Sequence, residues 1–144
     1  MIQMPESVYL QIRQHGEAAY PYESCGILIG TVSGATKLVT SAVPVPNSSP
    51  GNTRNHYQIA PLDLIHAERQ ARAAKHEIVG FYHSHPDHSA HWSPTDLAEA
   101  HWLDCTYVIT SINHGEAAET RAFHLNGTQE DDKHFQTEKI HITN

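Results

Sequence analysis

Residues 77–96 read EIVGFYHSHPDHSAHWSPTD, and the rest of the sequence is best understood outward from them. Glu77–His83 is an apolar run with β-branched residues, which is typical of a buried strand. Ser93–Asp96 (SPTD) is typical of a helix start, with a capping Ser, a Pro in the first turn and an acid three residues after the cap. Pro86–Trp92 is the loop between them. The pattern predicts a strand, a loop and a helix that runs to about Trp102.

Three side chains of this stretch have the chemistry of metal ligands. Residues two apart in a strand project to the same face, so His83 and His85 point together while Ser84 points away. Seven residues separate His85 from the predicted helix, enough to return Asp96 to the strand end. Two imidazoles and one carboxylate leave a fourth tetrahedral position open, as in catalytic zinc sites. The spacing therefore predicts a zinc site formed by His83, His85 and Asp96.

Each part of this pattern also has a simpler explanation. The chain contains 13 His, so an H-x-H triplet arises readily by chance. Ser93–Asp96 is a good helix cap without any ligand role, and an acid near a helix N-terminus is favoured by the helix dipole. It is the order of the parts, two His on a strand and then an acid at a helix start, that favours a metal site.

Outward from this stretch, predicted helices and strands intersperse along the chain. Apolar residues at helical spacing predict helices over Ser7–Ala19 and Pro61–Lys75. Asn47–Asn55 is dense in turn formers and predicts a loop. This arrangement predicts the α/β class, with a mixed sheet packed against helices. The remaining segments are predicted strands: Cys25–Val32, Lys37–Val45, Thr106–Ile112, Thr120–Leu125 and Phe135–Ile142.

Composition limits the possible functions. A length of 144 residues predicts one domain spanning residues 1–144, and 39% hydrophobic with 17% charged residues is typical of a soluble globular protein. A net charge of -7 disfavours a nucleic-acid partner, because phosphate binding needs clustered Lys and Arg. Cys25 and Cys105 are too few for a disulfide scaffold. Without a signal-like start or a long apolar run, we expect a cytoplasmic protein that does not enter membranes.

The motifs resemble those of the JAMM or MPN-plus (Mov34/JAB) zinc metallopeptidases. The family signature is an upstream Glu, then H-[ST]-H-P, a spacer and S-x-x-D. This chain has Glu23, His83–Pro86 (HSHP) and Ser93–Asp96 (SPTD), and Pro21–Gly30 (PYESCGILIG) is similar to the family's P-x-E-x-C-G-x-L-x-G segment. The resemblance implies a mixed, curved sheet flanked by helices, the cytidine-deaminase-like fold of that family, and a short member of prokaryotic type.

The resemblance also implies an activity and a role for each residue. Zn²⁺ would be held by His83, His85 and Asp96, with Glu23 as general base for the attacking water and Ser93 stabilising the oxyanion. The substrates implied are peptide or isopeptide bonds after the C-terminal Gly-Gly tail of a ubiquitin-like or sulfur-carrier protein.

The sequence is also compatible with two other functions. One is a non-catalytic MPN-type module that binds a ubiquitin-like protein, although such members lack some ligands and this chain has all three. Another is a DNA-repair-associated branch, which tends to have Asn where this chain has Ser84. Tyr57 resembles a family position beside the cleft, and is equally well explained as a half-buried aromatic at the start of a short strand. Cys25 is predicted to be a buried small hydrophobe.

Overall fold

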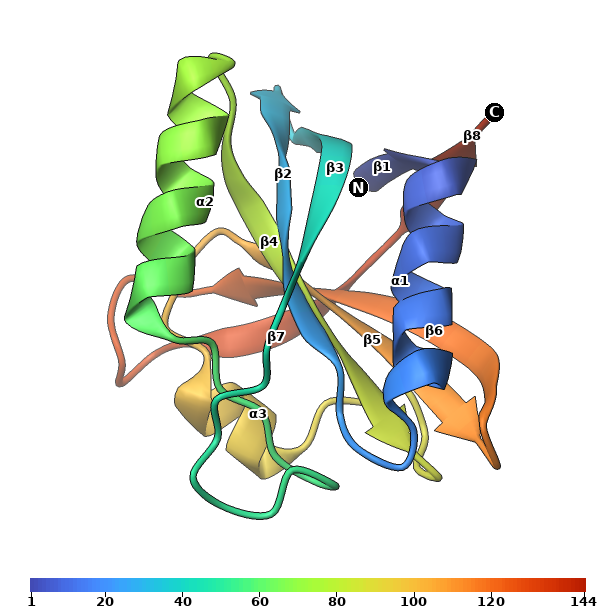
Figure 1. The fold of residues 1–144 in the computed structure, drawn as a ribbon. Helices are drawn as coiled ribbons and strands as arrows, with labels where there is room; N and C mark the ends of the chain where they lie inside the picture. The colour runs from blue at the N-terminus through green and yellow to red at the C-terminus, as the bar shows by residue number, and fades with distance from the viewer.

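The computed structural model describes residues 1–144 and has one eight-stranded sheet with three helices (Figure 1). The strand order across the sheet is β7-β6-β5-β4-β2-β3-β1-β8. β1 runs parallel to β3 and β8, and β4 runs parallel to β5, whereas the other neighbours are antiparallel. The predicted mixed sheet is therefore confirmed. The elements in chain order are β1 (Ile2–Pro5), α1 (Glu6–Ala19), β2 (Cys25–Ser33), β3 (Thr36–Val45), α2 (Pro61–Ala73), β4 (Glu77–Pro86), α3 (Pro94–Glu99), β5 (Thr106–Asn113), β6 (Glu116–Asn126), β7 (His134–Glu138) and β8 (Ile140–Thr143).

The two long helices, α1 and α2, cover opposite faces of the sheet, with the central strands between them (Figure 1). Side chains alternate between these faces along each strand. In β2, Ile27 belongs to the buried cluster that includes Ala67 of α2, while its neighbour Leu28 packs with Val8 of α1. Both faces of the central strands are thus buried, which explains their nearly continuous apolar sequence. None of the three helices combines the length and the apolar character that crossing a bilayer requires.

The two edges of the sheet differ from the sequence prediction. Phe135–Ile142 is not one strand, because it divides at Lys139 into β7, which pairs with β6, and β8, which pairs with β1. β1 itself was not predicted, since four residues give no periodic signal. β7 and β8 occupy opposite ends of the strand order yet are separated by one residue, so the sheet has to curl until its edges approach each other.

Several smaller boundaries were also predicted wrongly; β6, for example, begins at Glu116 rather than at Thr120. α3 ends at Glu99 rather than near Trp102, because Ala100 is buried in an extended conformation with ψ 115°. α2 ends at Ala73, before the predicted Lys75, whose φ of 60° is left-handed. β4 continues to Pro86, where a loop was expected. This last difference places both His83 and His85 inside a strand, so that their relative orientation is fixed by the sheet.

Candidate metal centre

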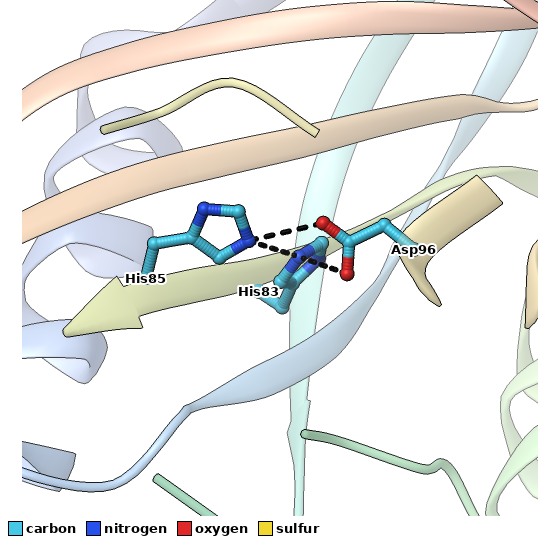
Figure 2. Close-up of side chains that lie close together, drawn as sticks. All are labelled: His83, His85 and Asp96. Carbon is cyan, nitrogen blue, oxygen red and sulfur yellow. Dashed lines mark hydrogen bonds and ion pairs between the residues drawn. The ribbon is translucent and has the colours of Figure 1, made fainter. Parts of the chain in front are cut away.

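The end of β4 brings two imidazoles to one face of the sheet. His83 lies opposite Cys25 in the β2–β4 register and belongs with the face covered by α2. The Nε2 atoms of His83 and His85 are 3.2 Å apart, and both side chains are buried. Figure 2 shows the two rings and Asp96 pointing toward one another. The alternation of the strand therefore produces the convergence that the H-x-H spacing predicts.

The third side chain comes from the first turn of α3. Asp96 Oδ1 lies 3.3 Å from His83 Nε2, and Asp96 Oδ2 lies 3.0 Å from His85 Nε2. A reciprocal capping box fixes this carboxylate: the Ser93 N–H donates to Asp96 Oδ2 over 2.9 Å, and the Asp96 N–H donates to Ser93 Oγ over 3.0 Å. The sequence left open whether Asp96 caps the helix or binds a metal. In the structure its carboxylate takes part in the cap and also faces the two imidazoles.

The hydrogen bond of His85 on its far side determines which nitrogen is free. His85 Nδ1 lies 2.8 Å from the Ser89 carbonyl, which can only accept, so Nδ1 carries the proton and Nε2 presents its lone pair to the centre. The loop carrying Ser89 is held in turn by the Ser111 hydroxyl, which donates to the His88 carbonyl over 2.7 Å. His83 Nδ1 is buried without a partner. The His83 ring is stacked by Tyr57, with ring centroids 4.3 Å apart.

The electrostatics of the three groups are strongly coupled. Burial alone would raise the pKa of the Asp96 carboxyl, but the two imidazoles and the Ser93 N–H hold that pKa well below its usual range. Burial lowers the pKa of His83. Burial also opposes protonation of His85, but hydrogen bonds to Asp96 and the Ser89 carbonyl outweigh it and raise the pKa of His85. Asp96 is therefore ionised and draws positive charge toward the centre.

This donor set fits a divalent cation. The candidate ligand atoms of His83, His85 and Asp96 all lie within 4.8 Å of one another. With Nδ1 of His85 protonated, imidazole lone pairs and carboxylate oxygens face each other at short range, which is repulsive unless a proton or a cation lies among them. Two imidazoles and a carboxylate suit zinc, which takes nitrogen ligands at about 2.0–2.1 Å and commonly keeps a fourth position open.

Glu23 lies two residues before the start of β2, close to the three candidate ligands. Continuing the β2–β4 register past Cys25 and His83 places Glu23 across from His85. The Glu23 side chain is buried at 5% exposure, and its Oε1 has no hydrogen-bond partner. Burial raises the pKa of Glu23 to about 8, and the charges of His85 and Asp96 also act on it. A buried, unpaired carboxyl with a pKa near neutrality has the properties of a general acid or base.

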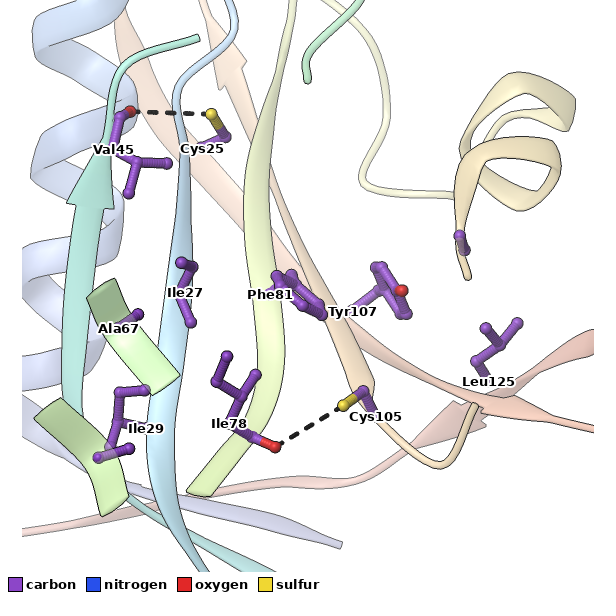
Figure 3. Close-up of a cluster of buried hydrophobic side chains, with 12 residues drawn as sticks. Cys25, Ile27, Ile29, Val45, Ala67, Ile78, Phe81, Cys105, Tyr107 and Leu125 are labelled. Atoms are coloured by element: carbon purple, nitrogen blue, oxygen red, sulfur yellow. Dashed lines mark hydrogen bonds between the residues drawn. The ribbon is translucent and has the colours of Figure 1, made fainter. Parts of the chain in front are cut away.

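An apolar cluster lies beneath this side of the sheet. Cys25, Ile27, Phe81 and Tyr107 are among its buried members (Figure 3). Cys25 is fully buried and its Sγ lies 3.8 Å from the Val45 carbonyl, so the prediction of a buried small hydrophobe is confirmed. Burial raises the pKa of the Cys25 thiol to about 12, so it is not a nucleophile at neutral pH. The cluster packs β4, the strand that carries His83 and His85, against α2.

A pocket adjoins the centre on the side of Tyr57. Its volume is about 310 Å³, and Phe81, Tyr107 and Glu99 are among the lining side chains. Tyr57 lines this pocket and also stacks on His83, so it separates the pocket from the candidate ligands. Tyr57 therefore lies beside the site, as the family resemblance implied.

Several residues around the centre were not predicted from the sequence. The His56 Nε2 lies 2.7 Å from a Glu99 carboxylate oxygen, and its Nδ1 is hydrogen-bonded to the Ser49 hydroxyl. These contacts link the loop between β3 and α2 to α3. His56 is one of 13 His, and no spacing connects it to Glu99, so no sequence signal pointed to this pair.

Solved structures share this fold. A solution structure from Desulfitobacterium hafniense superposes with a TM-score of 0.84 at 24% identity, covering 99% of this chain and 93% of the other. One from Salinibacter ruber gives a TM-score of 0.73 at 35% identity, covering 99% and 92%. A JAB1/MPN domain protein from Archaeoglobus fulgidus gives a TM-score of 0.60 at 13% identity, over 99% of each chain. The curled sheet and its helices therefore define a JAB/MPN fold.

Sequence comparison identifies the family within this fold. Residues 5–126 match the family described as prokaryotic homologs of the JAB domain, and the chain belongs to that family. It is 33% identical over 106 residues to the desampylase of Haloferax volcanii, covering 74% of each chain. It is 29% identical over 109 residues to a probable TtuB-protein conjugate cleaving protease of Thermus thermophilus, covering 76% of this chain and 69% of that relative.

Proposed function

We propose that this chain is a zinc-dependent hydrolase that cleaves peptide or isopeptide bonds after the C-terminal Gly-Gly tail of a ubiquitin-like or sulfur-carrier protein. The observation that carries the proposal is the convergence of His83, His85 and Asp96 beside a buried Glu23 whose Oε1 has no partner. The names of the two relatives support a substrate of this class, since one is a desampylase and the other a probable TtuB-protein conjugate cleaving protease. Residues 1–144 would act as one cytoplasmic domain.

His83, His85 and Asp96 would hold the zinc ion through the two Nε2 atoms and a carboxylate oxygen. When bound, zinc supplies a Lewis acid that polarises the substrate carbonyl and lowers the pKa of water to about 7. The Ser89 carbonyl keeps the tautomer of His85 that presents Nε2. The Ser93 backbone N–H holds Asp96 Oδ2, which leaves Oδ1 as the freer ligand oxygen.

Glu23 would move the proton that hydrolysis requires. Its unpaired Oε1 would accept one proton from the attacking water and deliver it to the nitrogen of the leaving amine as the C–N bond breaks. The second proton of the water leaves with ionisation of the new carboxylic acid, so that the final products are a carboxylate and a protonated amine. A raised pKa of about 8 in the metal-free protein arises mainly from burial, and a nearby cation would lower it toward the range of a base at neutral pH.

Ser93 would stabilise the oxyanion that develops on the scissile carbonyl. Its Oγ accepts a hydrogen bond from the Asp96 N–H, so the hydroxyl proton remains free to donate. A donor fixed by the helix cap needs little reorganisation during the reaction, which is the property that makes such donors effective. The capping box therefore orients a ligand and a hydrogen-bond donor together.

The proposal is tested by cleavage of sulfur-carrier or ubiquitin-like proteins that carry a peptide extension after Gly-Gly. We expect the zinc-loaded protein to release the extension, a chelator to stop the reaction, and zinc to restore it. Glu23→Gln should retain zinc but lose about 10²–10⁴-fold in rate, the usual contribution of general acid–base catalysis. Bound zinc without cleavage of any such fusion would instead indicate a non-catalytic binding module. Cleavage that persists in the presence of chelator would exclude the proposed mechanism.

A further inference from the structure

The backbone of Glu23 is not held by the sheet. Glu23 lies two residues before β2, and the residue between them, Ser24, is hydrogen-bonded to Ser84 of β4. Both backbone groups of Glu23 bond instead to the loop of residues 46–60 between β3 and α2. The Glu23 N–H donates to the Thr53 carbonyl over 2.7 Å, and the Glu23 carbonyl accepts from Asn47 Nδ2 over 3.3 Å. The direction of the Glu23 side chain therefore depends on this loop.

The Asn47 side chain is the centre of that loop. Its Nδ2 also donates to the His56 carbonyl over 2.9 Å. Its Oδ1 accepts from the backbone N–H groups of Ser49 and Gln58, over 3.1 and 3.2 Å. A primary amide has two donor hydrogens and two acceptor lone pairs, so all four hydrogen bonds of Asn47 are formed. One of the four leads to Glu23, and the other three organise the loop.

The Asn47 amide is also connected, through His56, to the other side of the metal centre. The residue held by its second donor, His56, pairs through its imidazole with Glu99 of α3. That helix carries Asp96 and is capped by Ser93. The chain of contacts from Glu23 through Asn47 and His56 to α3 therefore joins the general base to the element that carries one ligand and the oxyanion donor.

We propose that Asn47 is a positioning residue. Its side-chain amide fixes the peptide group between Glu23 and Ser24 and so holds the Glu23 carboxylate toward the metal centre. This inference rests on the proposed function of Glu23. It assigns no contact between Asn47 and substrate or metal. The ligands come from β4 and α3, and the Asp96 carboxylate is held by the Ser93 cap, not by Asn47 or His56. Loss of the Asn47 amide should therefore affect proton transfer and leave metal binding unchanged.

Two substitutions and one matched control distinguish the positioning of Glu23 from a general stabilisation of the loop. Asn47→Asp keeps an acceptor for the Ser49 and Gln58 N–H groups but removes both donors. Asn47→Ala removes all four bonds, and Asn47→Asp remains informative if the alanine variant does not fold. Ser48→Ala is the control, because Ser48 is exposed and its hydroxyl donates to the Gln58 carbonyl over 2.9 Å in the same loop without contacting Glu23.

The kinetic test uses zinc-loaded protein and a Gly-Gly-linked fusion. We expect Asn47→Asp to lower kcat by about 10–100-fold, the range typical of residues that orient catalytic groups, with KM and zinc content unchanged. Ser48→Ala should match the wild type. In a Glu23→Gln background, Asn47→Asp should have no further effect, because the group it positions is already inactive. Unchanged kcat with only a lower Tm, or an equal loss in the Glu23→Gln background, would overturn the inference.

A second readout does not depend on activity. In metal-free protein, the backbone amide hydrogen of Glu23 should exchange at least about tenfold faster in Asn47→Asp than in the wild type or Ser48→Ala. The reason is that the Glu23 N–H donates to the Thr53 carbonyl, and the loop that contains Thr53 is no longer held by the Asn47 donors. Unchanged exchange would overturn the inference. If the wild type cleaves no fusion while Glu23 exchange still accelerates in Asn47→Asp, the proposed function fails and the positioning of Glu23 by Asn47 stands.

Discussion

Two polar clusters are buried in this protein, and they differ in how their charges are compensated. The metal centre consists of His83, His85, Asp96 and Glu23. The second, here called the Lys37–Glu138 cluster, consists of Lys37, Thr106, His124 and Glu138. Lys37 Nζ lies 2.8 Å from His124 Nδ1 and 3.4 Å from Glu138 Oε2, and the Thr106 hydroxyl donates to Glu138 Oε1.

The difference between the clusters lies in their unpaired atoms. The two buried side-chain polar atoms of the chain that lack a partner, Glu23 Oε1 and His83 Nδ1, both belong to the metal centre. In the Lys37–Glu138 cluster an ammonium neutralises a carboxylate within the chain. The metal centre brings lone pairs and acids together with no Lys or Arg among them, so its compensating charge has to come from outside. Buried charges that are neutralised by other side chains of the same protein are typical of a structural cluster. Buried polar atoms without a partner are typical of a binding or catalytic site.

The clusters also lie at different ends of the sheet. Thr106 pairs with Gly80 near the start of β4, whereas His85 pairs with Ser111 near its end. Glu138 ends β7, just before the chain crosses to the opposite edge as β8. The Lys37–Glu138 cluster therefore joins strands where the sheet curls closed, and substitutions can test each cluster separately.

The largest effect should follow from removing a ligand. Asp96→Asn keeps an oxygen for the Ser93 cap but loses the charge that completes the donor set. We expect zinc affinity and cleavage to fall by more than about 100-fold, since even residues that only orient ligands cost 10–100-fold. Zinc content by elemental analysis and cleavage of a Gly-Gly fusion measure this. Asp131→Asn, at an exposed acid, is the control, and unchanged zinc content in Asp96→Asn would show that the ligand set is wrong.

The next effect should appear in stability rather than activity. Lys37→Met leaves the buried Glu138 with only the Met1 amino group, 3.2 Å from its Oε2, as a cationic partner. Removing one partner of a buried ion pair costs about 3–5 kcal/mol when no other charge compensates, so the loss of unfolding free energy in urea titrations should approach but not exceed that range. Activity per folded molecule should not change, because the cluster is remote from His85. The double variant Lys37→Met/Glu138→Leu should recover much of the lost stability. A loss of activity beyond the loss of folded protein would contradict the separation of the two clusters.

An effect of opposite sign is expected at Glu23. Its pKa of about 8 in the metal-free protein lies above the ordinary value of 4.5, so the folded state holds its proton more tightly than the unfolded state does. Stability therefore falls as pH rises from about 4.5 to 8. Glu23→Gln should remove this penalty and stabilise the metal-free protein by up to about 5 kcal/mol above pH 8, because a shift from 4.5 to about 8 corresponds to about 1.4 kcal/mol for each pKa unit, with no gain at pH 4.

The Lys37–Glu138 cluster provides the contrast for this pH dependence. Burial alone would raise the pKa of Glu138, but Thr106 and Lys37 lower it. Its contribution is therefore stabilising above the unfolded pKa and is lost as pH falls through the folded value. Glu138→Gln should destabilise the protein at neutral pH and lose this effect in acid. Parallel pH profiles for Glu23→Gln and Glu138→Gln would refute the distinction between the clusters.

The smallest effect concerns the helix cap that supports the metal centre. Ser93→Ala removes the acceptor for the Asp96 N–H and should cost about 1 kcal/mol in thermal or urea unfolding of the metal-free protein. Ser93→Gly should cost only a few tenths of a kcal/mol, since glycine is tolerated at this position. A cost for Ser93→Ala as large as that for Lys37→Met would mean that the cap contributes to the whole fold and not only to α3.

Much of the fold could be predicted because its central elements carry their own signals. The first helix was predicted over Ser7–Ala19 and extends over Glu6–Ala19, since its apolar spacing and its proline boundaries are local. β1 and the division of the last predicted strand at Lys139 could not be predicted, because β1 has four residues and pairs with β3 and β8, the latter 138 positions away for Ile2 and Ile140. The early end of α3, at the buried and extended Ala100, involves a distant residue: Lys133 Nζ donates to the Ala98 and Ala100 carbonyls.

By itself, the sequence determined which residues could form the metal centre. Strand alternation puts His83 and His85 on one face, and a capped helix start orients Asp96, because both rules act over a few neighbouring residues. Only the tertiary structure decided that Asp96 meets the imidazoles, that Glu23 is buried without a partner, and that Asn47 holds its backbone. Those relations depend on strand register and loop closure between distant segments, and burial then determines the pKa of Glu23.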